Sequence, residues 1–465
     1  MNFDEYSKLD GTALADLIRR GEITAGEAEA CAREGIERCR HLNAVISECR
    51  QQDFAADAPF SGVPFLIKEL VLQAAGAQCR SGSRAFGPDA PAAADSNLMA
   101  RFRSAGLHLV GTTQTPEMGY NATTETLAFG PVHNPWKAGH SAGGSSGGSG
   151  AAVAAGIVPI AHANDGGGSI RVPASCNGLV GLKPTRDRTP TGPGAADPLF
   201  AHAIEFALTR SVRDAAALLD LVAGPDVGAP HVIDPGSSSF VAQASARPRR
   251  LRVAFTNGSL LGDVSMDAEN VAAAEGAARS LADLGHDIVD CPIAIDFDEF
   301  ADHINDIWCV FAAQFVDMTC QMLRCQPDGG HFEAVTLTCA NHGRQVSALR
   351  ILAALDYVNR ISRATARAFE QFDVLLSSTL ATPPPVHGAL DQNDASLSAI
   401  EWTRNTFRYA NNTPLFNSTG QPAISLPLHR TADGLPVGIQ LAGTMGGEGL
   451  LLNLAQQLEE SVGWA

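Results

Sequence analysis

Two segments rich in glycine and serine are the parts of this sequence best suited to chemistry. They are Gly143-Gly-Ser-Ser-Gly-Gly-Ser-Gly150 and Asp165-Gly-Gly-Gly-Ser-Ile-Arg171. In the second, three consecutive glycines precede Ser169, and without β-carbons their N–H groups can converge on one point. Such a concave set of donors stabilises an oxyanion that forms beside a serine oxygen. The segment therefore favours nucleophilic attack by Ser169.

A serine nucleophile needs a base, and Lys68 is the candidate. Lys68 ends the apolar run Gly62-Val-Pro-Phe-Leu-Ile-Lys68, so its amine is expected in apolar surroundings. Desolvation there favours the neutral amine, which can accept a proton. Ser145, within the first glycine-rich segment, can relay that proton. Taken singly, a strand lysine is usually solvated and a loop serine usually caps a turn; together the three residues favour catalysis.

Other site types fit these residues less well. A phosphate loop would need a lysine after its last glycine, and 143–150 contains none. The GxSxG pattern at 143–147 matches a nucleophile elbow, but 134–141 is not a plausible central strand before it, so a Ser-His-Asp hydrolase stays a minor alternative. Cys320, Cys325 and His331 are the nearest approach to a metal cluster, without CxxC or HExxH spacing. We expect no metal and no cofactor.

The elements that must position these residues alternate between strands and helices. Strands are expected at 42–47, 62–68, 107–111, 250–255, 374–378 and 423–427, and helices at 12–20, 24–39, 95–106, 211–223, 300–323 and 345–372. The apolar stretch 151–163 suits a buried helix leading into a strand, and 226–249, rich in Pro, Ser and Gly, suits a surface excursion. The alternation predicts an α/β layered fold, and without a composition break one large domain is favoured over three.

Composition limits the partners. The 465 residues carry a formal net charge of -17, which disfavours nucleic acid or an anionic membrane as the main partner. No stretch reaches the 18 or so apolar residues of a spanning helix, and the N-terminus lacks signal-peptide features. The 10 cysteines show no framework spacing and are expected to be reduced thiols. A cytoplasmic protein is predicted; a homodimer is left open.

The glycine-rich motifs resemble those of the amidase signature enzymes. The resemblance includes both segments above, Gly178-Leu-Val-Gly-Leu-Lys-Pro-Thr185, the run ending at Lys68, Gln421-Pro-Ala-Ile-Ser-Leu-Pro427 and Gly434-Leu-Pro-Val-Gly-Ile-Gln440. It implies one α/β/α layered domain over 1–465 with a large mixed β-sheet covered by helices. Residues 60–200 and 374–460 carry the most diagnostic elements; 226–345 is the variable part and a candidate pocket region.

The resemblance also assigns roles. Ser169 would be the acylated nucleophile, Ser145 a bridging serine after a cis peptide, and Lys68 the terminal base. The oxyanion hole would be formed by backbone N–H groups of Gly166, Gly167, Gly168 and Ser169. Ser146, Asp165 and Arg171 would support the loops. Ala163-Asn164-Asp165 stands where family members often carry Gly-Thr-Asp, and 162–171 is similar to bacterial amidases that include the 6-aminohexanoate cyclic-dimer hydrolases.

These roles predict an amidohydrolase that cleaves a linear carboxamide through an acyl-enzyme, with carbamates or esters as variants. The alternatives are a glutaminase subunit of an amidotransferase and a non-catalytic binding protein. Met118, Asn121, Trp308 and Phe311 are candidate pocket residues, although an ordinary core face also explains the spacing of the last two. No basic cluster in these segments demands an anionic substrate, so a small, uncharged or weakly polar amide is expected.

Overall fold

The strands of this chain build one large sheet. The computed structural model describes residues 1–49, 54–87, 91–195, 197–234 and 236–464. The sheet strands are β1 (Val45–Glu48), β2 (Pro64–Lys68), β3 (His108–Thr113), β6 (Ile160–Asp165), β7 (Val180–Lys183), β8 (Ile204–Thr209), β9 (Arg252–Phe255), β10 (Asp287–Asp290), β11 (Val374–Ser378), β12 (Ala423–Arg430) and β13 (Pro436–Ala442). β4 (Glu125–Thr126) and β5 (Gly130–Pro131) pair separately.

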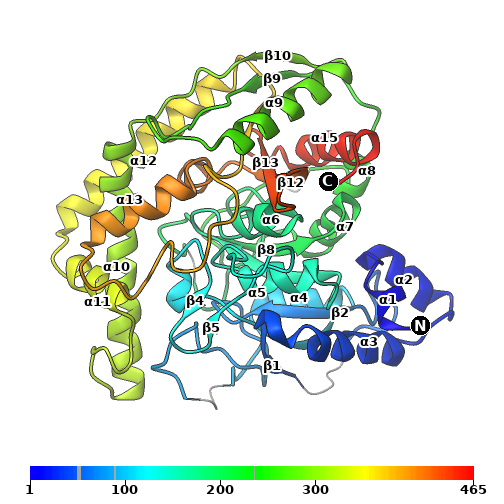
Figure 1. The fold of residues 1–465 in the computed structure, drawn as a ribbon, viewed down its shortest axis with the longest axis horizontal. Helices are drawn as coiled ribbons and strands as arrows, with labels where there is room; N and C mark the ends of the chain where they lie inside the picture. The colour runs from blue at the N-terminus through cyan, green and yellow to red at the C-terminus, as the bar shows by residue number, and fades with distance from the viewer. Residues whose placement is uncertain (50–53, 88–90, 196, 235, 465) are drawn as a thin grey trace.

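The sheet is mixed and has 11 strands in the order β1-β3-β2-β6-β8-β7-β12-β13-β11-β9-β10. It runs from β1 near the bottom of Figure 1 to β9 and β10 at the top. β2 pairs in parallel with β3 and β6, and β9 with β10 and β11. The other pairs are antiparallel, and β8 is inserted between β6 and β7. This arrangement confirms the expected α/β fold with a large mixed sheet.

Helices cover the sheet. They are α1 (Phe3–Tyr6), α2 (Gly11–Arg19), α3 (Ala25–Arg38), η1 (Arg40–Leu42), α4 (Asn97–Ser104), η2 (Glu117–Gly119), α5 (Gly147–Ala154), α6 (Arg171–Asn177), α7 (Val212–Val222), α8 (Phe240–Ala244), α9 (Ala268–Asp283), α10 (Phe297–Leu323), α11 (Ala334–Gly343), α12 (Ala348–Ala368), α13 (Ala399–Tyr409), α14 (Pro414–Thr419) and α15 (Glu448–Ser461).

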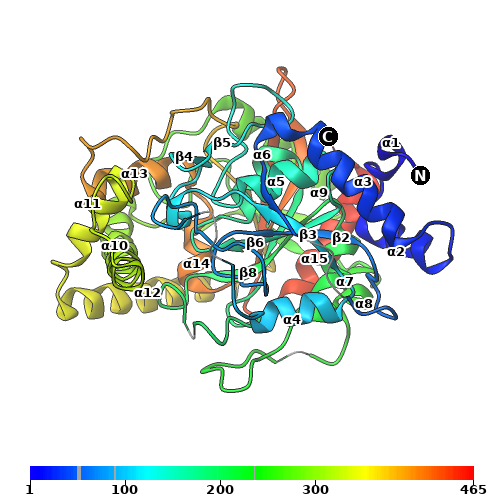
Figure 2. The same cartoon turned by 90° about the horizontal axis from the view of Figure 1, so that it is seen from below.

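The helices form three groups that pack against different parts of the molecule. α5 and α6 pack on each other and on the central strands, while α7, α8 and α15 pack together. α10 to α13 gather at the side of the molecule opposite the N-terminal helices, as both views show (Figures 1 and 2). No helix in the described part of the chain combines the length and the apolar character needed to cross a membrane.

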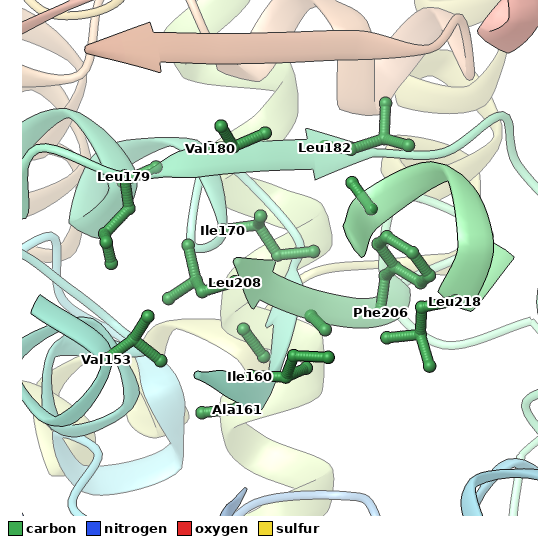
Figure 3. Packing of buried hydrophobic residues seen from close by; sticks show 14 of the residues in the cluster. Val153, Ile160, Ala161, Ile170, Leu179, Val180, Leu182, Phe206, Leu208 and Leu218 are labelled. Carbon is green, nitrogen blue, oxygen red and sulfur yellow. The ribbon is translucent and has the colours of Figure 1, made fainter. Parts of the chain in front are cut away.

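The core lies between the sheet and its helices. Side chains from β6, β7, β8, α5 and α7 pack together in Figure 3, among them Val153, Ile160, Leu182, Phe206 and Leu218. All of these are buried, as expected for the apolar positions of strands covered by helices. Polar side chains in these strands are correspondingly costly and call for a functional or structural reason.

Most expected elements are present, with small shifts at their ends. The helix expected at 24–39 is α3, and it begins with a capping box of Thr24 and Glu27. The strand expected at 42–47 starts later, because Arg40–Leu42 forms a helical turn that Asn43 ends in the left-handed conformation, with φ 54°. The excursion at 226–249 contains α8, which forms because buried Phe240 anchors it beside α7 and α15.

The packing of the central strands predicts the cost of truncating them. Ile424 on β12 is fully buried between β7 and β13, so Ile424→Ala is expected to lower the free energy of unfolding by about 2–5 kcal/mol. Leu349→Ala, on an exposed position of α12, should cost less than about 0.5 kcal/mol. Urea unfolding followed by circular dichroism measures both; equal midpoints would contradict the assignment of β12 to the core.

Candidate active site

Lys68 lies at the carboxyl end of β2 and is fully buried. Its Nζ is 2.6 Å from Ser145 Oγ and 2.5 Å from Asn164 Oδ1. Burial lowers the pKa of Lys68 to about 7, although the negative charges of Glu205 and Asp165 oppose that shift. The amine is therefore available in its neutral form near neutral pH, as the apolar run before it led us to expect.

Ser145 lies just before α5, where the first glycine-rich segment approaches β6. The peptide bond between Gly144 and Ser145 is cis, as the resemblance implied. The neighbouring Ser146 Oγ donates to the backbone carbonyl of Asn164 at 3.3 Å. Ser146 thus supports the segment rather than facing a cavity, while the hydroxyl of Ser145 is bonded to Lys68.

The segment that carries Ser169 is fixed by a buried ion pair. Arg171 Nε and Asp165 Oδ2 are 2.9 Å apart, and both side chains are fully buried. Asn417 Nδ2 donates to Asp165 Oδ1 at 2.8 Å, and Arg171 also donates to Thr413 and Gln440. Burial alone would raise the pKa of Asp165, but Arg171 and its other partners lower it to about 2. Asp165 and Arg171 therefore hold the loop in a charged, saturated network.

One of the expected oxyanion donors is already bonded. The N–H of Gly168 donates to Asp165 Oδ1 at 2.7 Å, and Gly168 has φ 135°, with Thr413 where a β-carbon would lie. In this structure the loop itself thus uses the N–H of Gly168. Among the hydrogen bonds of the described residues, none uses the N–H of Gly166, Gly167 or Ser169. These three remain the candidate donors.

Two cavities meet at Ser169. The first, of about 40 Å³, is lined by Gly119, Tyr120, Asn121, Ala122, Gly144, Gly167, Gly168, Ser169, Val172, Trp308, Trp402, Thr403, Thr406, Phe407 and Ala410. The second, of about 170 Å³, is lined by Leu70, Val71, Met118, Gly119, Ser145, Asn164, Gly166, Ser169, Pro198, Leu199, Ala203, Glu205, Trp308, Phe311 and Phe315. Ser145 and Ser169 therefore open onto the same space.

The four candidate pocket residues all reach these cavities. Asn121 lines the first cavity, Met118 and Phe311 line the second, and Trp308 lines both. Trp308 also stacks on Tyr120, with ring centroids 5.1 Å apart. Helix α10 thus brings residues from the variable region to the two serines.

Comparison with known proteins identifies the family of this chain. A family model described as Amidase matches residues 12–452, which is most of the chain. The chain belongs to the amidase family. This is the family of the amidase signature enzymes, hydrolases that act on amide C–N bonds.

Relatives cover nearly the whole length of this amidase. It is 36% identical to the 6-aminohexanoate-cyclic-dimer hydrolase of Paenarthrobacter ureafaciens, over 98% of this chain and 95% of that protein. It is 37% identical to AmiC of Mycobacterium tuberculosis, over 99% and 96%. A solved structure of 6-aminohexanoate cyclic dimer hydrolase superposes with a TM-score of 0.89 at 35% identity, covering 98% and 97%. The subgroup resemblance seen at 162–171 is confirmed.

Two residues of this amidase site were missed by the sequence reasoning. Asn164 accepts from Lys68 and donates to the backbone of Leu70, and Glu205 lines the second cavity. From the sequence, Asn164 stood out only as part of Ala163-Asn164-Asp165, where family members often carry Gly-Thr-Asp. The available signal was that each is a polar residue in a fully buried strand, although β6 also carries His162 and Asp165.

The metal candidates do not assemble in the amidase fold. Within the described ranges, no group of three or more His, Cys, Asp or Glu side chains could hold a metal ion. Cys320 and Cys325 lie with their Sγ atoms 3.7 Å apart, while His331 bonds to Asp328 at 2.9 Å.

The Arg171–Asp165 pair predicts a large stability effect. Removing one partner leaves an uncompensated buried charge, so Arg171→Met is expected to lower the free energy of unfolding by about 3–5 kcal/mol. Arg19→Met, which breaks an exposed pair with Asp16, should cost at most about 1 kcal/mol. Urea unfolding compares them, and similar small losses in both variants would show that the buried network is not needed.

Proposed function

We propose that this amidase hydrolyses a linear amide by acyl transfer through Ser169, with Ser145 and Lys68 as the proton relay. The observation that carries the proposal is the 2.6 Å hydrogen bond between Ser145 Oγ and a fully buried Lys68 amine whose pKa lies at about 7. A base with a pKa near the working pH transfers protons efficiently in both directions. No buried carboxylate makes an ion pair with Lys68 among the described residues, so the amine stays free to take up a proton.

The relay transfers a proton in both directions during acylation of Ser169, and again during hydrolysis of the acyl-enzyme. Ser169 Oγ attacks the carbonyl carbon while its proton passes to Ser145 and the Ser145 proton passes to Lys68 Nζ. The N–H groups of Gly166, Gly167 and Ser169 stabilise the oxyanion. When the C–N bond breaks, the relay returns the proton to the departing nitrogen, because an amide nitrogen leaves only once it is protonated. Water then attacks the acyl-Ser169 ester by the same route, releasing the acid.

The cavities support an amide with apolar groups near the scissile bond. Tyr120, Trp308, Trp402 and Phe407 contribute to the first cavity, and Leu199 and Phe311 are among the residues of the second. Carbamates and esters pass through the same acyl-enzyme and are secondary candidates. We also propose a cytoplasmic location, supported by ten free cysteines.

Labelling with a sulfonyl fluoride tests the nucleophile. A single adduct on Ser169, located by peptide mapping, is expected in the wild-type protein, and Ser169→Ala should lose both the adduct and about 10⁴-fold or more in kcat for amide hydrolysis. Ser280→Ala, on α9 and away from both cavities, is the matched serine control and should react normally. An adduct on Ser145 instead would make Ser145 the nucleophile.

The pKa of Lys68 predicts the pH dependence of the reaction. Only the neutral amine accepts a proton, so kcat/KM should fall about tenfold per pH unit below about 7 and level off above it. Burial also lowers the pKa of Lys183 to about 7, so Lys183→Met is the control and should keep this acid limb. A profile that is flat between pH 5 and 8 would exclude Lys68 as the base.

A further inference from the structure

Glu205 is a buried acid beside the reacting groups that the proposed relay does not use. Its side chain is 5% exposed and lines the second cavity together with Ser145 and Asn164. β8 pairs with β6 so that Glu205 lies directly opposite Asn164, and paired residues of antiparallel strands project from the same face. The register of β8 therefore brings a carboxyl group to the cavity side of Asn164, close to the end of β2.

The ion pairing of Glu205 is incomplete. His162 Nε2 lies 2.8 Å from Glu205 Oε2, and His162 carries a charge only when it is protonated. Among the described residues, no lysine or arginine nitrogen lies within 4.0 Å of the Glu205 carboxyl group. Buried acids are normally paired with a cation, and Glu205 Oε1 has no partner in the hydrogen bonds of the described residues. A cation entering the cavity would complete the pairing.

The position of the proton relay indicates which half of the substrate enters the second cavity. Ser145 must reach the leaving nitrogen to protonate it, and Ser145 lines the second cavity. Gly144, Gly167 and Gly168 line the first cavity, which Ser169 also borders and Ser145 does not. The acyl group therefore belongs in the first cavity and the departing amine in the second, next to Glu205.

The remaining walls of the second cavity are apolar. Leu70, Val71, Leu199, Phe311 and Phe315 are among them, and the cavity volume is about 170 Å³. Such walls accommodate an alkyl chain, while Glu205, the one carboxylate among the described lining residues, suits a positive charge at some distance from the amide. The combination of an apolar passage and a single buried acid is selective for an amine that carries a second, protonated amino group.

We propose that Glu205 binds an ammonium group on the leaving half of the substrate, so that amides of short alkyl diamines are preferred. This inference rests on the proposed function, and it revises the expectation of an uncharged substrate for the leaving half alone. The balance of the reaction is unchanged: water adds across the C–N bond, giving a carboxylic acid and a diamine. A cation held by Glu205 also disfavours protonation of the nearby Lys68, which keeps the base in its active form.

Two isosteric substrates test the preference. N-(5-aminopentyl)hexanamide and N-hexylhexanamide differ only in a terminal ammonium or methyl group. In the wild-type enzyme we expect kcat/KM to be about tenfold or more higher for the charged amide, the range of a hydrogen bond to a charged group. Glu205→Gln, which can still accept from His162, should lose most of this ratio, whereas a purely structural Glu205 would leave the ratio unchanged.

The control variant is Glu269→Gln. Glu269 also pairs with a histidine, His429, at 3.1 Å, but it lies on α9 away from the cavities, so the substrate ratio should be kept. A wild-type ratio at or below one, or an unchanged ratio in Glu205→Gln, would overturn the proposal. Hydrolysis of the neutral amide would then still support the proposed function.

A binding measurement separates the two proposals when neither amide is hydrolysed. Calorimetry with 1,5-diaminopentane at pH 8 is expected to detect binding to the wild-type protein and about tenfold weaker binding to Glu205→Gln. Hexylamine, with one ammonium group, should bind more weakly than the diamine. Absence of diamine binding to the wild-type protein would overturn the assignment of Glu205, whereas failure of Ser169 to react with a sulfonyl fluoride would count against the proposed function alone.

Discussion

The site depends on one constraint, namely that the Lys68 amine is kept out of water without a carboxylate to hold its proton. A buried lysine beside an aspartate or glutamate would form a stable ion pair and stay protonated. Here the partners within hydrogen-bond distance are the neutral groups of Ser145 and Asn164, and the negative charges of Glu205 and Asp165 act from farther away. Desolvation therefore dominates, and the neutral form of the lysine amine is available in the neutral pH range.

The scaffold serves this constraint by bringing two strand ends and two helix starts to one place. β2 ends at Lys68 and its parallel neighbour β6 ends at Asp165, while α5 and α6 begin just after Ser145 and Ser169. The charges of Asp165 and Arg171, which fix the loop that carries Ser169, neutralise each other as an ion pair. The cost of burying that pair is offset by its many hydrogen bonds, and the pair leaves Lys68 without a direct anion.

The proposed reaction centre and part of the cavity walls come from different parts of the chain. Lys68, Ser145 and Ser169 lie in segments with family motifs, whereas Trp308, Phe311 and Phe315 come from α10. A change in α10 can therefore alter which amide fits without moving the serines. Glu205 is different, because it belongs to the central sheet and lies near Lys68, so selectivity there and the state of the base are electrostatically linked.

The sequence by itself determined the local features. The glycine-rich segments, the apolar run before Lys68 and the capping box at Thr24 depend on neighbours a few residues away. Such patterns also placed the helices and strands that were expected to within a few residues, but they left other elements, among them β7, β8 and β13, unpredicted. The motif resemblance added the α/β/α domain and the candidate serines and lysine. The helical turn ahead of β1 escaped prediction because a single left-handed residue, Asn43, decides where that strand begins.

Only the tertiary structure decided the contacts between distant segments. Asn164 accepts from a lysine 96 residues away, Glu205 reaches the cavity because β8 is inserted beside β6, and the N–H of Gly168 is taken by Asp165. The division of the site into two cavities likewise needs α10 and α13 to pack beside the serine segments. Strand order and packing between remote elements set these contacts. They cannot be inferred from residue type and local spacing, because these describe only neighbours along the chain.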